Sequence, residues 1–395
     1  MSANPVNSWD TRLLAVSEST FGTAVAPANT QGLEVINVDL GMNESGKVRP
    51  KRDRSIGRGM QSGFVEGDVD PMDFSVITSV KSRAAVDTAP RELALYRAAG
   101  LLNTTNAGVS SVLSMASTPI ESAAFASATL SRFLGVGAGG QQAEVLRGCV
   151  VKALQWSGGN KELELQASGQ GVAKEVLGQI DSITLASGVV TSMTVTAQES
   201  YKLGLGYYLC ESEVIQVTAI TPGGTTATIA RAQLSTTGVA HTAQPLRPHY
   251  PSGVAFTGNP IAEPNATVIL GAISPLLVTE WSLDLTTGMD LLPHETSSKY
   301  IAGAKQVRYD VSYKLKAVLR GDRVDLQGMS KGRANVAVSL AQGIGVGGIA
   351  TFASANCEVM PFNVPDTAND IAMVDIELRV RDSGTASDAL TVTFT

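Results

Sequence analysis

The sequence predicts a mainly β protein with one packed α-helix and a small inserted all-β domain. Three observations lead to this prediction. Many short segments alternate apolar and polar residues, which is the periodicity of a half-buried strand. Helix signals are rare. Residues 178–248 differ from the rest because they are rich in Thr, Val and Ile and contain several glycines. The 395 residues suffice for two or three domains, or for one elaborated large domain.

Strand signals dominate the first part of the chain. LEVINVDL at 33–40 and SGFVEGDVDPMDFSVI at 62–77 both alternate, and the Gly and Pro of the second segment are compatible with a bulged or edge strand. Residues 148–159 and 160–169 flank a Gly-Gly-Asn turn and predict a hairpin. VAKEVL at 172–177 closes this half of the chain.

The best helix signal is APRELALYRAAGLL at 89–102. Pro90 suits the first helical position, Glu92 suits the positive end of the helix dipole, and Gly100 suits the C-terminal cap. These features predict one helix of about two to three turns. The uncharged stretch that follows, residues 103–120, is predicted as a loop with some extended structure.

The second part of the chain contains an insertion. Residues 178–248 include several short strand-like segments and predict a small β-domain, and the Pro-rich residues 249–265 predict a return linker. Strand signals then resume in four stretches: 279–292, 300–319, 333–342 and 370–382. The clearest alternation runs from Val307 to Leu315. We therefore expect residues 1–177 and 266–395 to form one discontinuous β domain.

No motif predicts catalysis or a bound cofactor. Two stretches fit the GxGxxG pattern, but neither lies between a strand and a helix as a dinucleotide fingerprint requires, so flexible loops are expected: Gly135, Gly137 and Gly140, and Gly343, Gly345 and Gly348. No GxSxG elbow and no Cys–His pairing stands out. Acid pairs such as Glu211 and Glu213, or Asp366 and Asp370, are expected to be solvated.

No spacing of histidines or cysteines predicts a metal site or a disulfide framework. We expect the three cysteines to be buried free thiols and the three histidines to be exposed or packed: Cys149, Cys210 and Cys357, and His241, His249 and His294. We expect no signal peptide and no membrane span, and so a protein made and kept in a cytosol-like compartment or in something assembled there.

Charge is the next informative feature. Charged residues make up 17% of the chain and the net charge is −6, with a pI of about 5.3. A free-standing DNA-binding protein usually has a basic balance, which this chain lacks. A surface with so few charges is often covered by another molecule, and self-association is the simplest cover.

One basic stretch interrupts this acidic chain. KVRPKRDRSIGRG at 47–59 carries six basic residues: Lys47, Arg49, Lys51, Arg52, Arg54 and Arg58. It could be a solvated loop, a nucleic-acid contact, or a loop that docks on another subunit. The stretch lacks aromatic residues for base stacking, and Pro50 and the glycines oppose a groove-binding helix. Docking is favoured because a basic loop on an acidic chain is complementary to further copies of that chain.

The order of these elements is similar to that of the major tail tube protein of long-tailed, non-contractile bacteriophages. The similarity rests on SGFVEGDVD, RELALYRAAGLL, WSGGNKELELQASG and the pair TEWSLDLTTGMDLL and YIAGAKQVRYDVSYKLKAVL, and it covers roughly 30–175 and 275–395. The resemblance implies a β-sandwich or barrel with one packed helix, assembled into stacked hexameric rings. It also implies that the long loop after the first strand reaches an adjacent ring. Residues 178–248 resemble the extra β-domains that some tube proteins carry outside the tube.

The resemblance further implies partners and a location. The partners are other copies of the chain, the tape-measure, tail-terminator and tail-tip proteins, and double-stranded DNA that passes through the lumen without specific binding. The location is the virion tail, assembled in the host bacterial cytoplasm. An acidic lumen would repel the genome and let it slide. Candidate lumen-facing acids are Glu66, Asp68 and Asp70.

Three other classes of protein stay open. One is another virion component, such as a capsid decoration, tail-terminator or tail-tip protein. A carbohydrate-binding β-module protein would need exposed aromatics, whereas aromatic content is 5% and Trp9, Trp156 and Trp281 are scattered. A hydrolase on a β scaffold lacks a nominated nucleophile.

Overall fold

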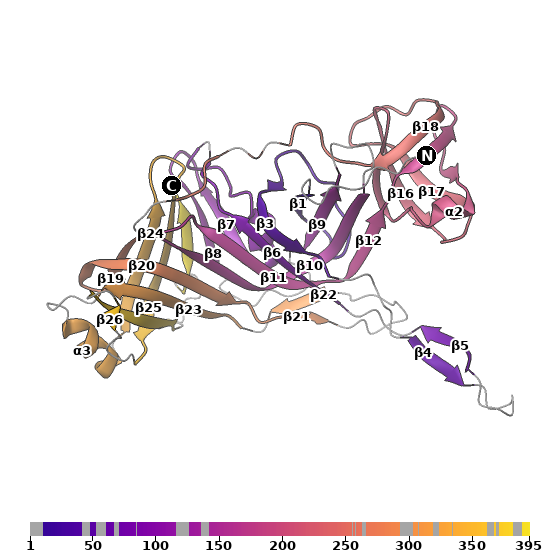
Figure 1. The fold of residues 1–395 in the computed structure, drawn as a ribbon. Helices are drawn as coiled ribbons and strands as arrows, with labels where there is room; N and C mark the ends of the chain where they lie inside the picture. Colours follow the sequence, from indigo (N-terminus) through magenta and orange to yellow (C-terminus); the bar gives the residue numbers. More distant parts are fainter. Residues whose placement is uncertain are drawn as a thin grey trace.

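A computed structural model of the chain describes residues 11–41, 48–52, 61–66, 71–83, 85–115, 126–135, 142–254, 256, 258–262, 266–292, 303–306, 308–318, 324–333, 335–361, 367–368, 371–381 and 389–395. Within these residues the protein is mainly β with three short helices, which confirms the predicted class (Figure 1). One helix was predicted; α2 and α3 are additional.

Six strands of the C-terminal half close into a ring. Each is antiparallel to the next, and the last pairs with the first: β19 (Ala266–Leu270), β20 (Ile273–Thr286), β23 (Asp310–Val318), β27 (Ile371–Val380), β25 (Ile349–Val359) and β24 (Asn335–Gly343). Their inward side chains, such as Leu315, Leu340 and Ile376, are buried in the main core. Closure satisfies the backbone groups that an open sheet would leave at its edges.

A hairpin extends this ring. β28 (Thr391–Phe394) pairs with β25 and with β8 (Ser110–Met115), and β8 pairs with β7 (Leu101–Asn106). Residues 103–120 were predicted as a loop with some extended structure; β7 and β8 make most of this stretch extended up to Met115, and residues 116–120 lie outside the described residues. The Ser- and Thr-rich composition of this stretch resembles a loop. Leu113 and Met115 of β8 are nevertheless buried in the core.

The N-terminal half joins the ring through one long strand, β10 (Gln142–Gly159). The second half of β10 pairs with β20 and with β11 (Glu164–Gly171), so the predicted hairpin at 148–169 is confirmed. β11 continues to β6 (Met72–Ser79) and β3 (Val35–Asp39). The first half of β10 pairs with the strands of a second layer: β9 (Ala128–Leu134), β12 (Ala173–Leu177) and, through β9, β1 (Thr11–Ser17) and β2 (Gly32–Leu33).

The bend between the two halves of β10 lies at Gly148. Its φ is +63°, and a Cβ there would lie 2.8 Å from Val172 Cγ2, so both the backbone angle and the close packing require glycine. The Gly148 N–H donates to the carboxylate of Glu18 at 2.9 Å. Glu18 is 3% exposed and also accepts from Gly22 N at 2.8 Å, Thr129 Oγ1 at 2.7 Å and Ser127 Oγ. Four donors replace the water that this buried carboxylate loses.

The main core is built around aromatic rings beneath α1 (Leu93–Ala98), the predicted helix. Tyr96 of α1 stacks on Trp156 with ring centroids 5.9 Å apart. The Trp156 and Phe352 ring centroids are 5.7 Å apart. The indole N–H of Trp281 donates to Gln342 Oε1 at 2.8 Å, which satisfies a buried donor. The three cysteines are buried free thiols, as predicted.

Residues 180–248 form a separate sheet of six strands, hereafter the module. Its order is β13 (Ile180–Leu185), β18 (His241–Pro248), β15 (Gly206–Cys210), β16 (Glu213–Ile220), β17 (Thr226–Gln233) and β14 (Ser192–Thr194), with α2 (Ala197–Ser200) after β14. In Figure 1 the module lies at the end of the molecule opposite α3 (Val324–Gly332).

The module covers one face of the second layer. Leu14, Phe133, Val145 and Leu177 of that layer share one buried apolar cluster with module residues such as Tyr208. The alternate residues of the same strands, such as Leu13 and Leu146, point to the main core. The second layer is therefore buried on both faces, and removal of the module would expose apolar side chains.

Three small pairings complete the fold. β4 (Val48–Arg52) pairs with β5 (Gln61–Glu66), β21 (Met289–Leu292) pairs with β22 (Gly303–Gln306), and β26 (Thr367–Ala368) pairs with the start of β27. The predicted strand over 300–319 is thus divided into β22 and β23, and Val307 lies outside the described residues. Among the described residues, no helix has both the length and the apolar content to cross a membrane.

We predict that Glu92→Gln stabilises the protein at alkaline pH. Glu92 is 3% exposed, and burial raises its pKa from 4.5 to about 7 despite the nearby charges of Arg91 and Arg83. The folded state binds this proton more tightly than the unfolded state, so stability falls as pH rises from 4.5 to about 7. Urea unfolding should show Glu92→Gln to be more stable than the parent by about 1–3 kcal/mol above this window. Below it, the advantage should vanish. An equal difference at both pH values would contradict the assignment.

Candidate functional site

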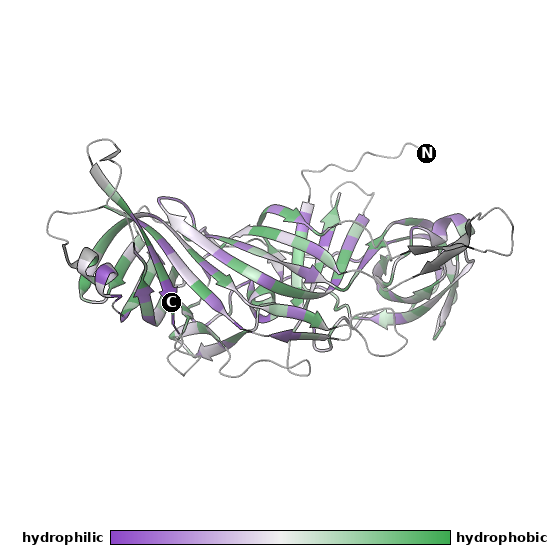
Figure 2. Cartoon of the chain, turned by 90° about the horizontal axis from the view of Figure 1, so that it is seen from below, coloured by the Kyte–Doolittle hydropathy of each residue, from purple (hydrophilic) through white to green (hydrophobic). Residues whose placement is uncertain are grey.

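The broadest functional feature is a polar sheet face. β6, β11, the second half of β10, β20, β23 and β27 lie side by side, and their inward residues, such as Leu165, Leu283 and Tyr313, belong to the core. Their alternate residues are mostly half-exposed or exposed and mostly polar, although Ser79 is buried. The apolar members are Ile77, Ala153, Leu277, Val318 and Met373. Hydrophilic and hydrophobic residues alternate along the long strands in Figure 2. We call this surface the polar face.

The register aligns the polar face into rows. Paired positions give one row across six strands: Ile77, Gln166, Gln155, Asp284, Ser312 and Arg379. The next row on the same face is Ser79, Glu164, Ser157, Ser282, Lys314 and Glu377. At the centre, Gln155 Nε2 donates to Asp284 Oδ1 at 2.5 Å, and Lys314 Nζ lies 2.9 Å from Asp284 Oδ2. The hydrogen bond that Lys314 donates to Asp284, together with the charge of Asp284, raises the pKa of Lys314.

The polar face is acidic overall. Its carboxylates belong to Asp73, Glu164, Glu280, Asp284, Asp310, Asp375 and Glu377, and its cations to Lys314, Lys316 and Arg379. Most remaining side chains are short hydroxyls or amides. Such a surface repels a polyanion while offering many weak hydrogen-bond partners to water. It is suited to contact with solvent or with a mobile anion.

Residues 48–52 of the predicted basic stretch lie in a hairpin that projects from the body, hereafter the arm (Figure 1). A loop was expected, yet Arg49, Lys51 and Arg52 lie on β4, which pairs with β5 from Val48↔Glu66 to Arg52↔Gln61. The other basic residues of the stretch lie outside the described residues: Lys47, Arg54 and Arg58.

The predicted lumen acids do not belong to the polar face where they can be placed. Glu66 is the last residue of β5 in the arm, and Asp68 and Asp70 lie outside the described residues. The acids of the polar face were missed, although a signal existed. In a strand with clear alternation, the polar positions between the apolar ones identify that face directly. Asp310, Ser312 and Lys314 are examples.

A buried ion cluster holds the root of the arm. Lys174 of β12, whose side chain is 3% exposed, donates to Gly41 O at 2.8 Å and lies 3.4 Å from Glu144 Oε1. Arg132 of β9 pairs with the same carboxylate and donates to Val38 O at 3.3 Å. The two cations thus bind carbonyls just before the arm, while Glu144 compensates their charge. This cluster fixes the position from which the arm leaves the body.

A second buried ion network lies in the module. Glu213 was expected to be solvated, but it is fully buried, whereas Glu211 is half-exposed. Arg231 donates to both Glu213 oxygens, at 2.9 and 2.5 Å, and His241 lies 2.8 Å from a carboxylate on each side, those of Glu211 and Glu213. The expectation failed because only the fold brings β16, β17 and β18 together around this carboxylate.

The network sets the charge state of Glu213 and the shape of its loops. Burial alone would raise the Glu213 pKa, but hydrogen bonds from Arg231, His241, Ala232 N and Val239 N outweigh it and lower the pKa to about 2. Glu211, Ala232 and Ala243 have positive φ between 52° and 54°, a region that non-glycine residues seldom adopt. Because these polar groups bind each other, the network acts as an internal brace for the module.

The described residues contain no cluster of three or more His, Cys, Asp or Glu side chains that could hold a metal ion. Gly343, Gly345 and Gly348 lie in and beside the turn between β24 and β25. A strand follows them, whereas a phosphate-binding loop of this pattern is followed by a helix.

No known family could be assigned by comparison. A scan against protein-family models found no match, and a search of curated proteins found no similar sequence.

We predict that Lys174→Met loosens the arm. Loss of the buried ammonium leaves Gly41 O without its donor and Glu144 with one cation fewer, which should cost about 1–3 kcal/mol of unfolding free energy. Limited proteolysis should then cut within 42–70 faster than in the parent. Lys305→Met, at an exposed position, is the matched control and should change neither measurement. Unchanged cleavage in Lys174→Met would contradict the role of the cluster.

We predict that Glu213→Gln strongly destabilises the module. It leaves Arg231 buried without its counter-charge, and breaking a buried pair in this way costs about 3–5 kcal/mol. Because the folded pKa is depressed, the parent should lose this stabilisation as pH falls from 4.5 toward 2. Thermal unfolding at neutral pH measures the loss, with Glu280→Gln as the exposed control. Equal melting of both variants would refute the brace.

Proposed function

We propose that this chain is a structural protein of a bacteriophage tail, which self-assembles into stacked rings of six copies that enclose a channel for DNA. The observation that carries the proposal is the polar face. A sheet of six strands, apolar on one side and acidic and polar on the other, is what a subunit needs in order to contribute a wall to a water-filled channel.

Open strand edges support assembly with further copies. Among the described strands, β3 pairs only with β6, and β7 pairs only with β8. Each carries an exposed apolar residue, Ile36 at 54% and Leu102 at 52%. An exposed edge with apolar side chains favours pairing with another chain, and heterologous contacts between two different surfaces generate rings and tubes.

The arm supports contact between rings. A two-stranded hairpin is marginally stable on its own in water, so an arm that leaves the body needs a surface on which to dock. β4 carries three basic residues, Arg49, Lys51 and Arg52, whereas the whole chain has a net charge of −6. We propose that the arm docks on an acidic surface of a copy in the adjacent ring.

The proposal also assigns the remaining surfaces. DNA passes the polar face without specific binding, because the carboxylates of that face outnumber its cations and repel phosphates. The module, which lies at one end of the subunit, decorates the outside of the tube. Tape-measure, tail-terminator and tail-tip proteins are the proposed partners at the channel and at the tube ends, within the virion.

Negative-stain electron microscopy of the purified protein at high concentration tests the assembly. We expect hollow rings or short tubes at low salt that dissociate at high salt, since the arm contact is electrostatic. Uniform monomers at every concentration and salt would contradict the proposal. A glycan array would then test the carbohydrate-binding alternative.

We predict that the double charge reversal Arg52→Glu and Arg54→Glu abolishes tubes but leaves the subunit folded. Like charges would then face each other at the proposed ring contact. The control, Lys202→Glu with Arg333→Glu, makes the same change in net charge at positions away from the arm. Micrographs and circular dichroism of both variants give the readout, and tubes of normal length from the arm variant would refute docking by the arm.

A further inference from the structure

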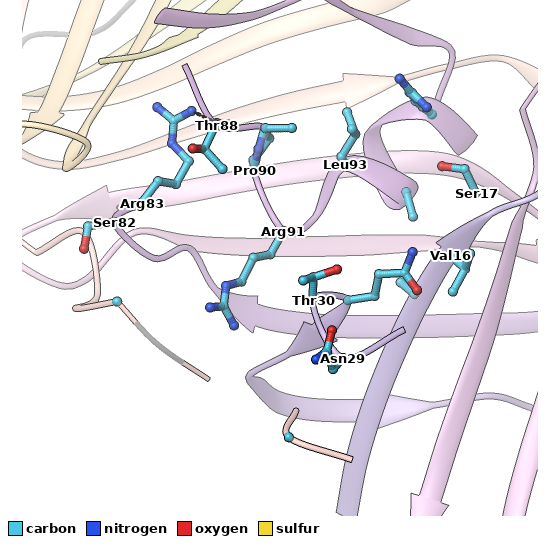
Figure 3. Close-up of a pocket in the computed structure, with 17 residues that line it drawn as sticks. Val16, Ser17, Asn29, Thr30, Ser82, Arg83, Thr88, Pro90, Arg91 and Leu93 are labelled. Carbon is cyan, nitrogen blue, oxygen red and sulfur yellow. Dashed lines mark hydrogen bonds between the residues drawn. The ribbon is translucent and has the colours of Figure 1, made fainter. Parts of the chain in front are cut away.

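A pocket of about 710 Å³ lies beside α1 and is not explained by the proposed assembly. It is formed by the end of β1, residues 29–31, residues 82–83, several residues between 88 and 97, and two glycines of the linker, Gly253 and Gly258 (Figure 3). Apolar side chains, among them Val16, Pro90 and Leu93, form part of its wall. Its volume is in the range of small-molecule sites, which are typically apolar with a few polar groups.

The charged side chains that line the pocket are all cations. They are Arg83, Arg91 and Arg97, and none of the described residues that line it is Asp or Glu. Neutral hydrogen-bonding groups accompany them: Ser17, Asn29, Thr30, Gln31, Ser82 and Thr88. In Figure 3, Arg91 points toward the side on which Asn29 and Thr30 lie, whereas Arg83 points toward Thr88. Three guanidinium groups in one concave site are unexpected on a chain with net charge −6.

Arg83 has hydrogen-bonding capacity left over. Its Nη1 donates to Thr88 O, and its guanidinium lies 4.9 Å from the centre of the Phe394 ring. Its Nε and Nη2 are buried, and within the described part of the chain neither has a hydrogen-bond partner. A buried donor without a partner costs free energy, and the cost is larger on a charged group.

The nearby acids compensate Arg83 only in part. Burial lowers its pKa, while the charges of Glu92 and Asp87 raise it. Glu92 is itself buried, and its pKa of about 7 leaves it partly protonated near neutral pH. Asp87 accepts a hydrogen bond from Gly108 N at 2.9 Å. These two acids therefore offset the charge of Arg83 only in part.

We propose that this pocket binds an anionic group, a carboxylate or a phosphate, through its arginines, with carbon atoms of the ligand against the apolar wall. Guanidinium groups match the geometry of both anions and bind them with two parallel hydrogen bonds. The anion is either a free small molecule or an acidic side chain of a second copy. The site goes beyond the proposed tube function, because a free ligand needs no assembly.

Calorimetric titration of the monomeric protein at constant ionic strength tests the site, with inorganic phosphate and glutarate as probes and chloride as the reference salt. We expect saturable binding of at least one probe, weakened about tenfold or more in Arg91→Gln, which is the loss of a charged hydrogen bond. Arg83→Gln should act in the same direction, and Arg83→Lys serves if that variant does not fold. Arg333→Gln, at an exposed position outside the pocket, should bind like the parent.

The outcomes separate the two sources of the anion. Binding of a probe that Arg91→Gln weakens identifies a free small anion, whether or not tubes form. If neither probe binds but Arg91→Gln weakens self-association in sedimentation while Arg333→Gln does not, the anion is a carboxylate of a second copy. If neither binding nor self-association responds to Arg91→Gln, the proposal is wrong.

Discussion

The structure depends on the bend of β10. This strand pairs with β9 and β12 in one layer and with β11 and β20 in the other, so it connects the N-terminal half to the closed ring. The change of direction requires Gly148 at φ +63° and a partner for its N–H, which Glu18 provides. Because Glu18 also binds Gly22 and Thr129, one buried carboxylate ties two segments, residues 18–22 and β9, to the bend. Four hydrogen bonds compensate a charge that has no described cation beside it.

The two periodic phases of the strands serve different purposes. One phase builds the core around Trp156 and Phe352, and the other forms the polar face around Asp284. In the second layer both faces contribute apolar residues to a buried cluster, because the module covers the face that would otherwise meet water. The same strand geometry thus yields a solvent-facing wall in one place and a domain interface in another. Which outcome applies is decided by what packs outside the sheet.

Buried charges mark the places where segments distant in sequence meet. Glu144 with Lys174 and Arg132 lies at the arm root, and Glu213 with Arg231 lies in the module. Each charged group loses its hydration on burial. Hydrogen bonds that only one arrangement of the segments allows compensate this loss. Such networks specify geometry more than they add stability. The pocket differs from them because the buried nitrogens of Arg83 keep donors to spare.

The sequence by itself determined the β class, most strands, the helix near residues 93–98 and the hairpin at 148–169, because alternation, capping and turn residues are local signals. It also marked the basic stretch of the arm. It predicted only some extended structure where the β7–β8 hairpin lies, because Ser- and Thr-rich strands resemble a loop, and it missed α3, whose glycines weaken the helical signal. Only the tertiary structure decided that Glu213 is buried, that Glu66 lies in the arm, and that the acids of six strands share one face. Those facts depend on register and on contacts between distant segments, which no local pattern contains.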